Sequence, residues 1–351
     1  MSNQFIIGNH RVGNFLDPYI IAEIGVNHEG SLKTAMQLIR EAKEGGAHAA
    51  KFQSYKADKI ASKNSPAYWD ITKESTESQY DLFQKYDGFE PEDYEKLAAY
   101  CREIGIDFLS TPFDLDAVDF LSPLVPVFKI ASADITNVPL IRKCAKKRKP
   151  VIISTGAASL AEIETAVQIA REAGCCDLAL LHCVLNYPTP ENRAQLSSIP
   201  ILIRTFPDCV IGYSDHVVPD ATIASLEAAM LLGASILEKH FSNDKTLPGN
   251  DHYHAMDKKD LKRFTAKVDK YREMIGTGGK NMQLEQSARK HARRSIVAAC
   301  DIKKGETLSE ENLIAKRPGY GISPLLWDNI VGKKAVKRIK SDELISWDMI
   351  T

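Results

Sequence analysis

Eight short apolar segments between residues 19 and 241 constrain the fold of this chain more than any other feature. Each is a nearly continuous run of Val, Ile, Leu, Ala and Phe, such as "VIIS" or "LALLHC", as in parallel strands buried on both faces. Most end in residues that can bind an anion, a sugar hydroxyl or a metal. This arrangement predicts a (β/α)8 (TIM) barrel with its chemistry at the carboxyl ends. The predicted strands are Tyr19–Val26, Ala47–Gln53, Gly105–Thr111, Val125–Ser132, Pro150–Thr155, Asp177–Val184, Val210–His216 and Ala234–Phe241.

The stretches between these strands supply helices that cover the sheet. For example, "LKTAMQLIREAKEGG" closes on the glycine pair expected after a helix end. The 351 residues, 44% of them hydrophobic, accommodate one barrel of about 250 residues and a small second unit. The turn "GTGG" at residues 276–279 and the basic stretch after it interrupt the alternation of strand and helix. We therefore expect a barrel at 1–280, a linker at 281–292, and a compact unit of short strands and turns at 293–351.

The charge balance and the cysteines limit the possible partners and chemistry. A net charge of -1, from 45 basic and 46 acidic residues, gives no general attraction to nucleic acid or acidic lipid, so we expect small-molecule partners. No N-terminal signal and no apolar run of about 20 residues is seen, so we expect a cytoplasmic protein without a membrane span. Seven cysteines without metal-cluster spacing favour reduced thiols. Cys183 ends a strand, but His182 beside it faces the opposite side, which favours packing over a nucleophilic role.

The first chemical cluster contains Glu23 in "IAEIGVNHEG" and Lys51 with Gln53 in "AAKFQS". Lys51 and Gln53 share one face of their strand because neighbouring residues alternate. An interior glutamate in an apolar strand is costly unless it is paired. The cluster therefore indicates either a functional carboxylate at the barrel mouth or a structural ion pair between Glu23 and Lys51.

The second cluster is an anion site. Lys129 in "VFKIASAD" is followed by Ser132 and Asp134, and Ser154 ends the next strand. Two ammonium groups with hydroxyls and backbone N–H groups suit a phosphate or a carboxylate, and a substrate that carries both would use all of them. The alternative is that the lysines only pair with Glu23 or Glu238.

A metal site is predicted where the seventh and eighth strands end in His216 and His240. Adjacent strands of a closed barrel allow the two rings to converge, and imidazoles with carboxylates suit Mn, Co or Zn more than Mg. A rival ligand set lies in "GNDHYH", where Asp251, His252 and His254 follow the eighth strand. The third alternative is that no metal binds.

These clusters together indicate carbon–carbon bond formation, in which a metal polarises a carbonyl and the lysines hold an anionic partner. Nucleotide binding is unsupported because the sequence has neither a P-loop nor a strand-turn-helix glycine fingerprint.

Ten motifs, in order, resemble the sialic acid synthase family and cover essentially the whole chain. They are "IAEIGVNHEGS", "KFQ", "STPFD", "FKIASAD", "STG", "HCVLNYPTP", "IGYSDH", "LEKHF", "GNDH" and "KRPGYGI". The C-terminal unit resembles the antifreeze-like (SAF) domain of those synthases. The resemblance implies that phosphoenolpyruvate is joined to an open-chain N-acylated hexose, either N-acetylmannosamine or a 2,4-diacetamido sugar, to give a nonulosonic acid and phosphate.

The same resemblance implies roles for individual residues. Glu23, Lys51, Lys129, His216 and His240 would be catalytic, and His216 and His240 would hold the divalent cation, with Mn2+ preferred over Mg2+ or Co2+. The residues implied to bind phosphoenolpyruvate are Lys51, Thr111, Lys129, Ser132, Ser154, Asn186 and Ser214. Those implied to bind the sugar are Glu23, Gln53, Asp134, Tyr187, Asp251 and Arg317. Arg317 would come from the partner subunit of a domain-swapped homodimer.

Two positions depart from the family pattern. The family often has "SGE" where this chain has "SAD", so Asp134 is one methylene shorter than the usual glutamate. The family asparagine commonly lies two residues before the tyrosine of "YPTP", whereas Asn186 is directly before Tyr187. Adjacent residues in an extended segment face opposite ways, so Asn186 could take the family role only if the chain bulges there.

Two other classes of function remain open. The first is a metal-free Schiff-base aldolase or lyase in which Lys129 or Lys239 is the nucleophile. The second is a saccharide-binding protein without turnover, in which the barrel is only a scaffold.

Overall fold

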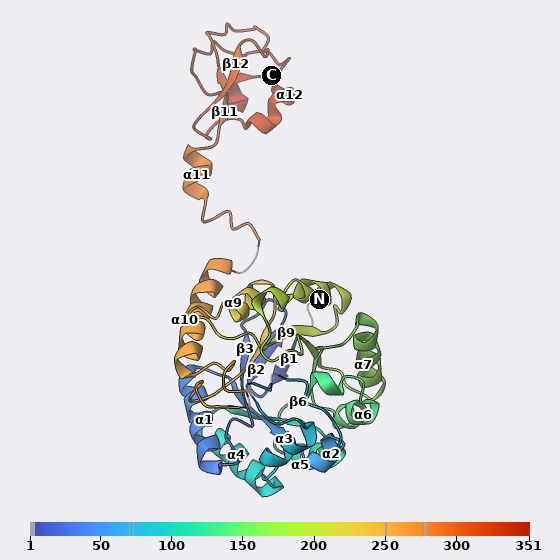
Figure 1. Ribbon diagram of the computed structural model, residues 1–351. Coiled ribbons are helices and arrows are strands. Elements are labelled where there is room, and N and C mark those ends of the chain that lie inside the picture. Colours follow the sequence, from blue (N-terminus) through green and yellow to red (C-terminus); the bar gives the residue numbers. More distant parts are fainter. Residues whose placement is uncertain (1–3, 70, 73, 250, 277–278) are drawn as a thin grey trace. The chain divides into compact units, whose positions relative to one another are not determined.

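The computed structural model describes residues 4–69, 71–72, 74–249, 251–276 and 279–351 (Figure 1). The chain divides into two compact units, residues 1–274 and 275–351, and each is described by itself. Two predicted motifs extend beyond the described residues, because Asn250 of "GNDH" and residues 277–278 of "GTGG" lie outside them.

The first unit is a nearly closed barrel of eight parallel strands, which confirms the predicted fold. The hydrogen-bonded order is β5-β4-β3-β10-β9-β8-β7-β6, and β5 and β6 pack side by side at the remaining gap. Each strand overlaps one of the eight predicted segments. Their bounds are β3 (Tyr19–Gly25), β4 (Ala49–Ser54), β5 (Asp107–Pro112), β6 (Phe128–Ile130), β7 (Val151–Ser154), β8 (Leu178–Cys183), β9 (Val210–Asp215) and β10 (Ile236–His240).

Helices surround the strands (Figure 1). The Ser31 side chain accepts a hydrogen bond at the start of α1, and Gly46 ends that helix in the left-handed conformation, which glycine adopts without steric cost. Apolar faces of these helices pack on outward-facing strand residues such as Ile20 and Phe108. The helices around the barrel are α1 (Leu32–Gly45), α4 (Pro91–Ile104), α5 (Leu115–Leu121), α6 (Val138–Lys146), α7 (Leu160–Glu172), α8 (Ser198–Thr205), α9 (Ala224–Leu231) and α10 (Lys258–Ile275).

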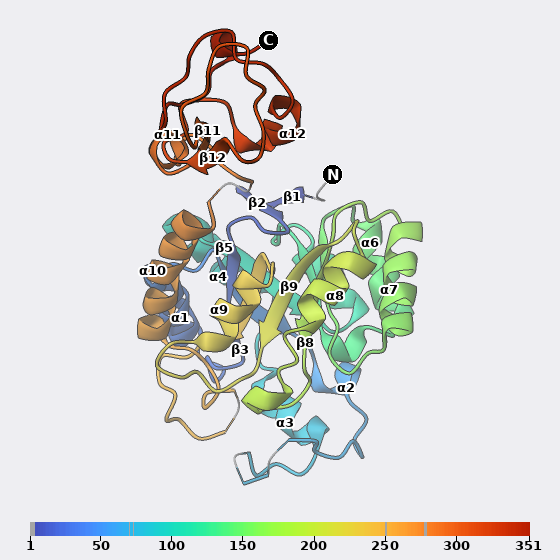
Figure 2. The same ribbon diagram turned by 90° about the horizontal axis from the view of Figure 1, so that it is seen from above.

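Further short elements lie between the strands and helices of the barrel. The sequence analysis did not predict the antiparallel hairpin that precedes the first barrel strand, β1 (Gln4–Ile7) and β2 (His10–Gly13). Its Phe5, Ile7 and Val12 pack with interior residues of the barrel, including Ile236. The other short elements are α2 (Ala57–Ile60), α3 (Gln79–Tyr86), η1 (Ser132–Asp134) and η2 (Glu191–Arg193). Figure 2 shows α2 and α3 at the end of the barrel opposite to the hairpin.

The second unit has its own small core and a two-stranded antiparallel sheet. Ile296, Leu313 and Ile339 are buried in that core, as expected for a compact unit of short strands and turns. Its elements are α11 (Gln286–His291), β11 (Ser295–Ala298), β12 (Leu313–Lys316), η3 (Pro324–Leu326), α12 (Trp327–Ile330) and η4 (Trp347–Met349).

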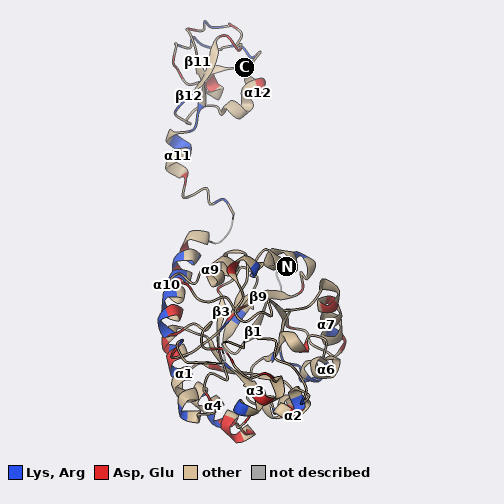
Figure 3. Cartoon of the chain, in the orientation of Figure 1, with Lys and Arg blue, Asp and Glu red and all other residues tan. Residues whose placement is uncertain are grey.

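The outer helices of the barrel carry both basic and acidic residues. Figure 3 shows basic and acidic residues interspersed along α4 and α10. Across the described part of the chain, none of the helices is both long and apolar enough to span a membrane.

Replacing Gly212 with alanine is expected to destabilise the barrel. Gly212 lies in β9, and a methyl group there would collide with the Ile236 carbonyl oxygen on the next strand and with the Leu181 side chain. Because backbone cannot move aside cheaply, we expect a loss of about 1 to 3 kcal/mol, measured by urea unfolding. The control is Gly88→Ala, where an added methyl group meets nothing within 4 Å. Equal stability of the two variants would contradict the close approach of β9 and β10.

Candidate active site

A cavity of about 390 Å³ opens at the carboxyl ends of the barrel strands. Its lining contains most of the residues that the sequence analysis singled out, brought together from many parts of the chain. These are Glu23, Lys51, Gln53, Thr111, Lys129, Ser132, Asp134, Ser154, Tyr187, Ser214, His216, His240 and Asp251.

Strand register explains how these side chains meet. In the parallel ladders, His240 of β10 pairs with Glu23 of β3, and Glu23 pairs with Lys51 of β4. Likewise, Gln53 pairs with Thr111, and Ser214 pairs with Glu238. Paired residues on neighbouring strands point to the same face, so each pair projects into the cavity together.

The lysines and glutamates form a buried ion network. Lys51 Nζ lies 2.5 Å from Glu23 Oε2, 3.7 Å from Glu238 Oε1, and donates to Thr111 Oγ1 at 3.2 Å. Lys129 Nζ lies 3.5 Å from Glu238 Oε1 and donates to Ser154 Oγ at 2.7 Å. The ion pairs expected under the structural alternative are therefore present. They line the cavity, however, so pairing and ligand binding are compatible.

Burial and neighbouring charges shift the pKa values of this network in different directions. Burial raises the pKa of Glu23, and its contacts with Lys51 only partly offset this. Burial would also raise the pKa of Glu238, but the nearby Lys129 and Lys51 ammonium groups outweigh it and the pKa is lowered. Burial lowers the pKa of Lys129. Glu23 is thus the carboxyl of this network that most readily holds a proton, as a proton carrier requires.

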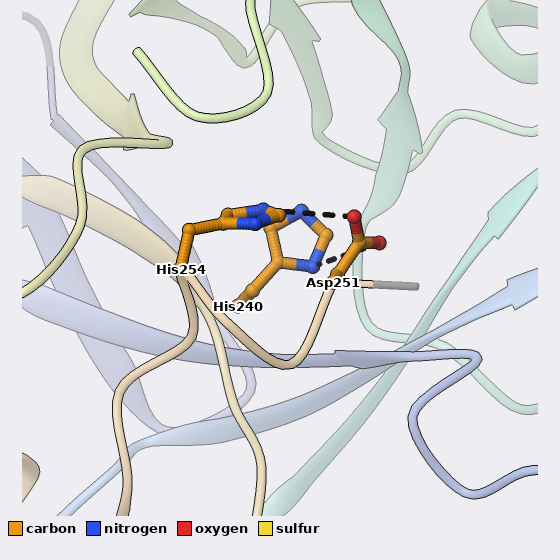
Figure 4. Close-up of side chains that lie close together, drawn as sticks. All are labelled: His240, Asp251 and His254. Atoms are coloured by element: carbon orange, nitrogen blue, oxygen red, sulfur yellow. Dashed lines mark ion pairs between the residues drawn. The ribbon is translucent and has the colours of Figure 1, made fainter. Parts of the chain in front are cut away.

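A second cluster combines His240 from β10 with Asp251 and His254 from the loop that follows (Figure 4). His240 Nδ1 lies 3.3 Å from Asp251 Oδ2, and His254 Nε2 lies 3.5 Å from Asp251 Oδ1. One ligand atom from each residue lies within 4.8 Å of the others. Two imidazoles and a carboxylate form a donor set suited to a divalent transition metal.

Buried ring nitrogens of this cluster are available to coordinate a metal ion. His240 Nδ1 and both ring nitrogens of His254 are buried without a hydrogen-bond partner among the described residues. Burial holds the pKa of His240 and His254 well below the usual value, so both rings are neutral at pH 7 and have a lone pair available. Unsatisfied buried nitrogens are costly, and metal coordination would satisfy them.

His216 stands beside this cluster, with its ring centroid 5.3 Å from that of His240 and 6.0 Å from that of His254. Its Nδ1 lies 3.1 Å from the Val184 carbonyl oxygen, which accepts a hydrogen bond from the protonated Nδ1 in the tautomer that leaves Nε2 with a lone pair. The structure therefore brings His240 of the predicted strand pair together with Asp251 and His254 of the rival loop set, and His216 lies beside them. His252 does not join them, because its Nδ1 lies 2.8 Å from Ser242 Oγ and its Nε2 lies 3.4 Å from Glu29.

Two nucleophile hypotheses are not supported by the geometry. Lys239 lies outside the cavity lining, fully buried, with Nζ 2.8 Å from Asp215 and 2.5 Å from the Val217 carbonyl oxygen. The geometry therefore does not support Lys239 as a Schiff-base nucleophile, because its ammonium group contacts Asp215 and Val217 outside the cavity lining. Cys183 lines the cavity, but burial raises the pKa of its thiol to about 11, so it stays protonated.

Two predicted site residues are not in the described cavity lining. Asn186 lies outside it, while its neighbours Leu185 and Tyr187 belong to it. The assignment of Asn186 to phosphoenolpyruvate is therefore unsupported by this geometry. Arg317 lies in the second unit, directly before Pro318.

The sequence analysis missed an aromatic rim of the cavity, which comes from the segment 55–90 between β4 and α4. The aromatic rim comprises the aromatic residues Tyr68, Trp69, Phe83 and Tyr86 and the aliphatic residues Ile60 and Leu82. The density of aromatic residues in this segment was a usable signal, but no strand or helix pattern pointed them toward the site.

Comparisons with known proteins agree with the architecture. The NeuB family matches residues 38–280, and the SAF domain matches residues 293–351. The N,N'-diacetyllegionaminic acid synthase of Campylobacter jejuni is 41% identical and covers 93% of this chain and 98% of its own length. The human N-acetylneuraminate-9-phosphate synthase is 33% identical, with 95% and 92% coverage.

A solved structure shows the same similarity. The crystal structure of an N-acetylneuraminic acid (sialic acid) synthetase from Leptospira borgpetersenii, in complex with citrate, superposes with a TM-score of 0.73. It is 34% identical, and the match covers 82% of this chain and 95% of that one. With a family match over more than half of its length and relatives of this similarity over nearly all of it, the chain belongs to the NeuB family of nonulosonic acid synthases and carries a SAF domain.

Proposed function

We propose that this protein condenses phosphoenolpyruvate with an open-chain N-acylated hexose, in a metal-dependent reaction that forms a carbon–carbon bond and releases phosphate. The acceptor would be N-acetylmannosamine or a 2,4-diacetamido-trideoxyhexose. The observation that carries the proposal is one cavity lined by two buried lysines and by His240 and Asp251, which cluster with His254. An anion site beside a potential metal site is what this condensation needs.

Phosphoenolpyruvate carries a carboxylate and a phosphate, and the lysines would bind both. Lys51 contacts Glu23 and Lys129 contacts Glu238, so the two ammonium groups are held in place before substrate arrives. The hydroxyl groups of Thr111, Ser132, Ser154 and Ser214 add neutral donors around them. Charge-assisted hydrogen bonds of this kind are the strong ones and fix the anion in one orientation.

The sugar would bind with its aldehyde toward the cluster of His240, Asp251 and His254, with His216 beside it. Mn2+ is the preferred ion, and Mg2+ or Co2+ are alternatives. A bound divalent cation would supply Lewis-acid polarisation of the aldehyde. Gln53 and Tyr187 line the same cavity and would contact the hydroxyl or acyl groups of the sugar, as would Asp134.

The proposed reaction forms one carbon–carbon bond and breaks the C–O bond between C2 and the phosphate. C3 of phosphoenolpyruvate bonds to the aldehyde carbon, and water adds to C2. The C2–O bond to phosphate then breaks as C2 becomes a ketone, and the remaining proton of the C2 hydroxyl leaves with the phosphate. Glu23, whose pKa burial raises, would give a proton to the former aldehyde oxygen and regain one from the added water. Lys51 and Lys129 would stabilise the departing phosphate.

The test is phosphate release from phosphoenolpyruvate with Mn2+, using three acceptors in turn: N-acetylmannosamine, its 6-phosphate, and a 2,4-diacetamido-2,4,6-trideoxyhexose. Release that needs both sugar and metal, and that stops with EDTA, supports the proposal. Sugar binding without phosphate release would favour a saccharide-binding protein instead.

A Schiff-base lyase stays the second candidate for Lys129 alone, since burial lowers the pKa of this cavity lysine. Borohydride treatment in the presence of pyruvate separates the two. A covalent adduct on Lys129 would favour the lyase, and its absence in an enzyme that releases phosphate would favour the condensation.

If the protein is a domain-swapped homodimer, Arg317→Ala should impair sugar use without unfolding the chain. We further expect that co-expression of Arg317→Ala with Lys129→Met restores about a quarter of the wild-type activity, because half of the randomly formed dimers have one intact site out of two. Each variant purified alone is the control. Mixed dimers as inactive as both parents would contradict a contribution of Arg317 across the dimer.

A further inference from the structure

We infer that the aromatic rim and Glu74 form a specificity subsite for the distal end of the acceptor, which favours a sugar with acylamido groups and a methyl at C6 and disfavours one with a phosphate there. This inference rests on the proposed function and adds the chemical class of the acceptor.

The cavity has two unlike halves. Its charged floor lies on the strand ends, where Lys51 and Lys129 are 2% and 3% exposed. The aromatic rim comes from segment 55–90, and its Tyr68 is 57% exposed. The aldehyde must reach the buried floor, where phosphoenolpyruvate would be held, so the other end of the sugar points toward the aromatic rim.

The aromatic rim presents ring faces and edges to that distal end. Tyr68 packs edge-on against Trp69 and Tyr187, with ring centroids 5.5 Å and 6.3 Å away. The Tyr187 ring lies 4.3 Å from that of His216, so Tyr187 connects the aromatic rim to the floor. Methyl and acetamido groups gain dispersion and hydrophobic contact on such rings, whereas a phosphate dianion would lose hydration there without compensation.

The charges of the cavity also disfavour a phosphate at the distal end of the sugar. Among the described lining residues, the ammonium groups belong to Lys51 and Lys129, both on the floor. At the aromatic rim, the lining includes the Glu74 carboxylate.

The Glu74 side chain is held in place. Its Oε1 accepts from the Thr76 N–H at 2.9 Å and from Lys85 Nζ at 3.1 Å. Oε2 lies so close to Gly249, in the loop that carries Asp251, that a Cβ there would approach it to 2.7 Å. A fixed carboxylate opposes a second anion in the same space and can accept a hydrogen bond from an acylamido N–H.

The test compares kcat/KM for the three acceptors in the wild type and three variants. We expect the wild type to prefer the 2,4-diacetamido-2,4,6-trideoxyhexose over N-acetylmannosamine 6-phosphate by at least about a hundredfold. Glu74→Gln keeps the shape and removes the charge, so it should raise kcat/KM for the 6-phosphate about tenfold. Tyr68→Ala should raise KM for the diacetamido sugar about three- to tenfold. The control Glu77→Gln, exposed on the same segment, should change neither value.

The outcomes separate the two proposals. Wild-type enzyme that uses the 6-phosphate as well as the diacetamido sugar overturns the inference and leaves the proposed function standing. The same holds if Glu74→Gln and Tyr68→Ala, both folded by circular dichroism, leave the acceptor preference unchanged. No phosphate release with any acceptor overturns the proposed function itself, and this inference with it.

Discussion

His240→Ala is expected to abolish metal-dependent phosphate release and to weaken Mn2+ binding by at least about a hundredfold. His240 Nδ1 is buried, has no hydrogen-bond partner among the described residues, and faces Asp251 at 3.3 Å. Alanine removes one of two imidazoles from the cluster, and a site with one imidazole and one carboxylate has little affinity for a divalent ion. His254→Ala should have an effect of similar size, since both its ring nitrogens are also unsatisfied.

Isothermal titration with Mn2+ checks the binding, and a phosphate assay checks the turnover. The control is His10→Ala in the hairpin, where the ring packs against Tyr19 and His48. Unchanged Mn2+ affinity in both His240→Ala and His254→Ala would refute the metal assignment. Loss of affinity in His240→Ala alone would restrict the site to the strand pair, His216 and His240, that the sequence predicted.

The barrel was predictable because strands buried on both faces are apolar throughout, which is visible in sequence without any partner. The predicted segments locate all eight strands, although the fourth shrinks from Val125–Ser132 to Phe128–Ile130. The hairpin β1–β2 was missed, since each strand has only four residues and exposed and buried positions alternate in β1 but not in β2. Nothing in so short a pattern shows that Phe5, Ile7 and Val12 pack into the barrel.

The floor of the site was predictable for a related reason. Parallel strands bring their carboxyl ends to one edge, so Glu23, Lys51 and His240 had to lie near each other once the barrel was inferred. No comparable rule predicts which loop residues come together. His252 and His254 are two positions apart, yet one contacts Ser242 and the other faces Asp251. Only the conformation of the folded loop decides which imidazole reaches the cluster. The position of the aromatic rim likewise depends on how the segment 55–90 folds.

Lys51→Met is expected to damage both stability and activity. Lys51 is buried between Glu23 at 2.5 Å and Glu238 at 3.7 Å, so methionine leaves two buried carboxylates with less compensation. Removing one partner of a buried ion pair costs about 3 to 5 kcal/mol, and we expect a loss of this size at neutral pH in urea unfolding. We also expect kcat/KM for phosphoenolpyruvate to fall at least about a hundredfold, because a fixed cation of the anion site is lost.

The stability loss should depend on pH with a defined sign. Burial already raises the pKa of Glu23 in the folded protein, and without Lys51 that pKa rises further. A carboxyl with a raised folded pKa stabilises the fold most below its unfolded pKa, and this stability is lost as pH rises through the folded pKa. The difference in unfolding free energy between wild type and Lys51→Met should therefore shrink as the solution is acidified.

The double variant Lys51→Met with Glu23→Gln separates the two effects of this lysine. It removes the cation together with its nearest carboxylate, so stability at neutral pH should recover by at least half of the loss. Activity should not recover, because the anion site still lacks Lys51. Recovery of both stability and activity would mean that Lys51 acts on turnover only by holding Glu23. A stability difference between wild type and Lys51→Met that stays constant with pH would contradict the burial of an uncompensated Glu23 charge.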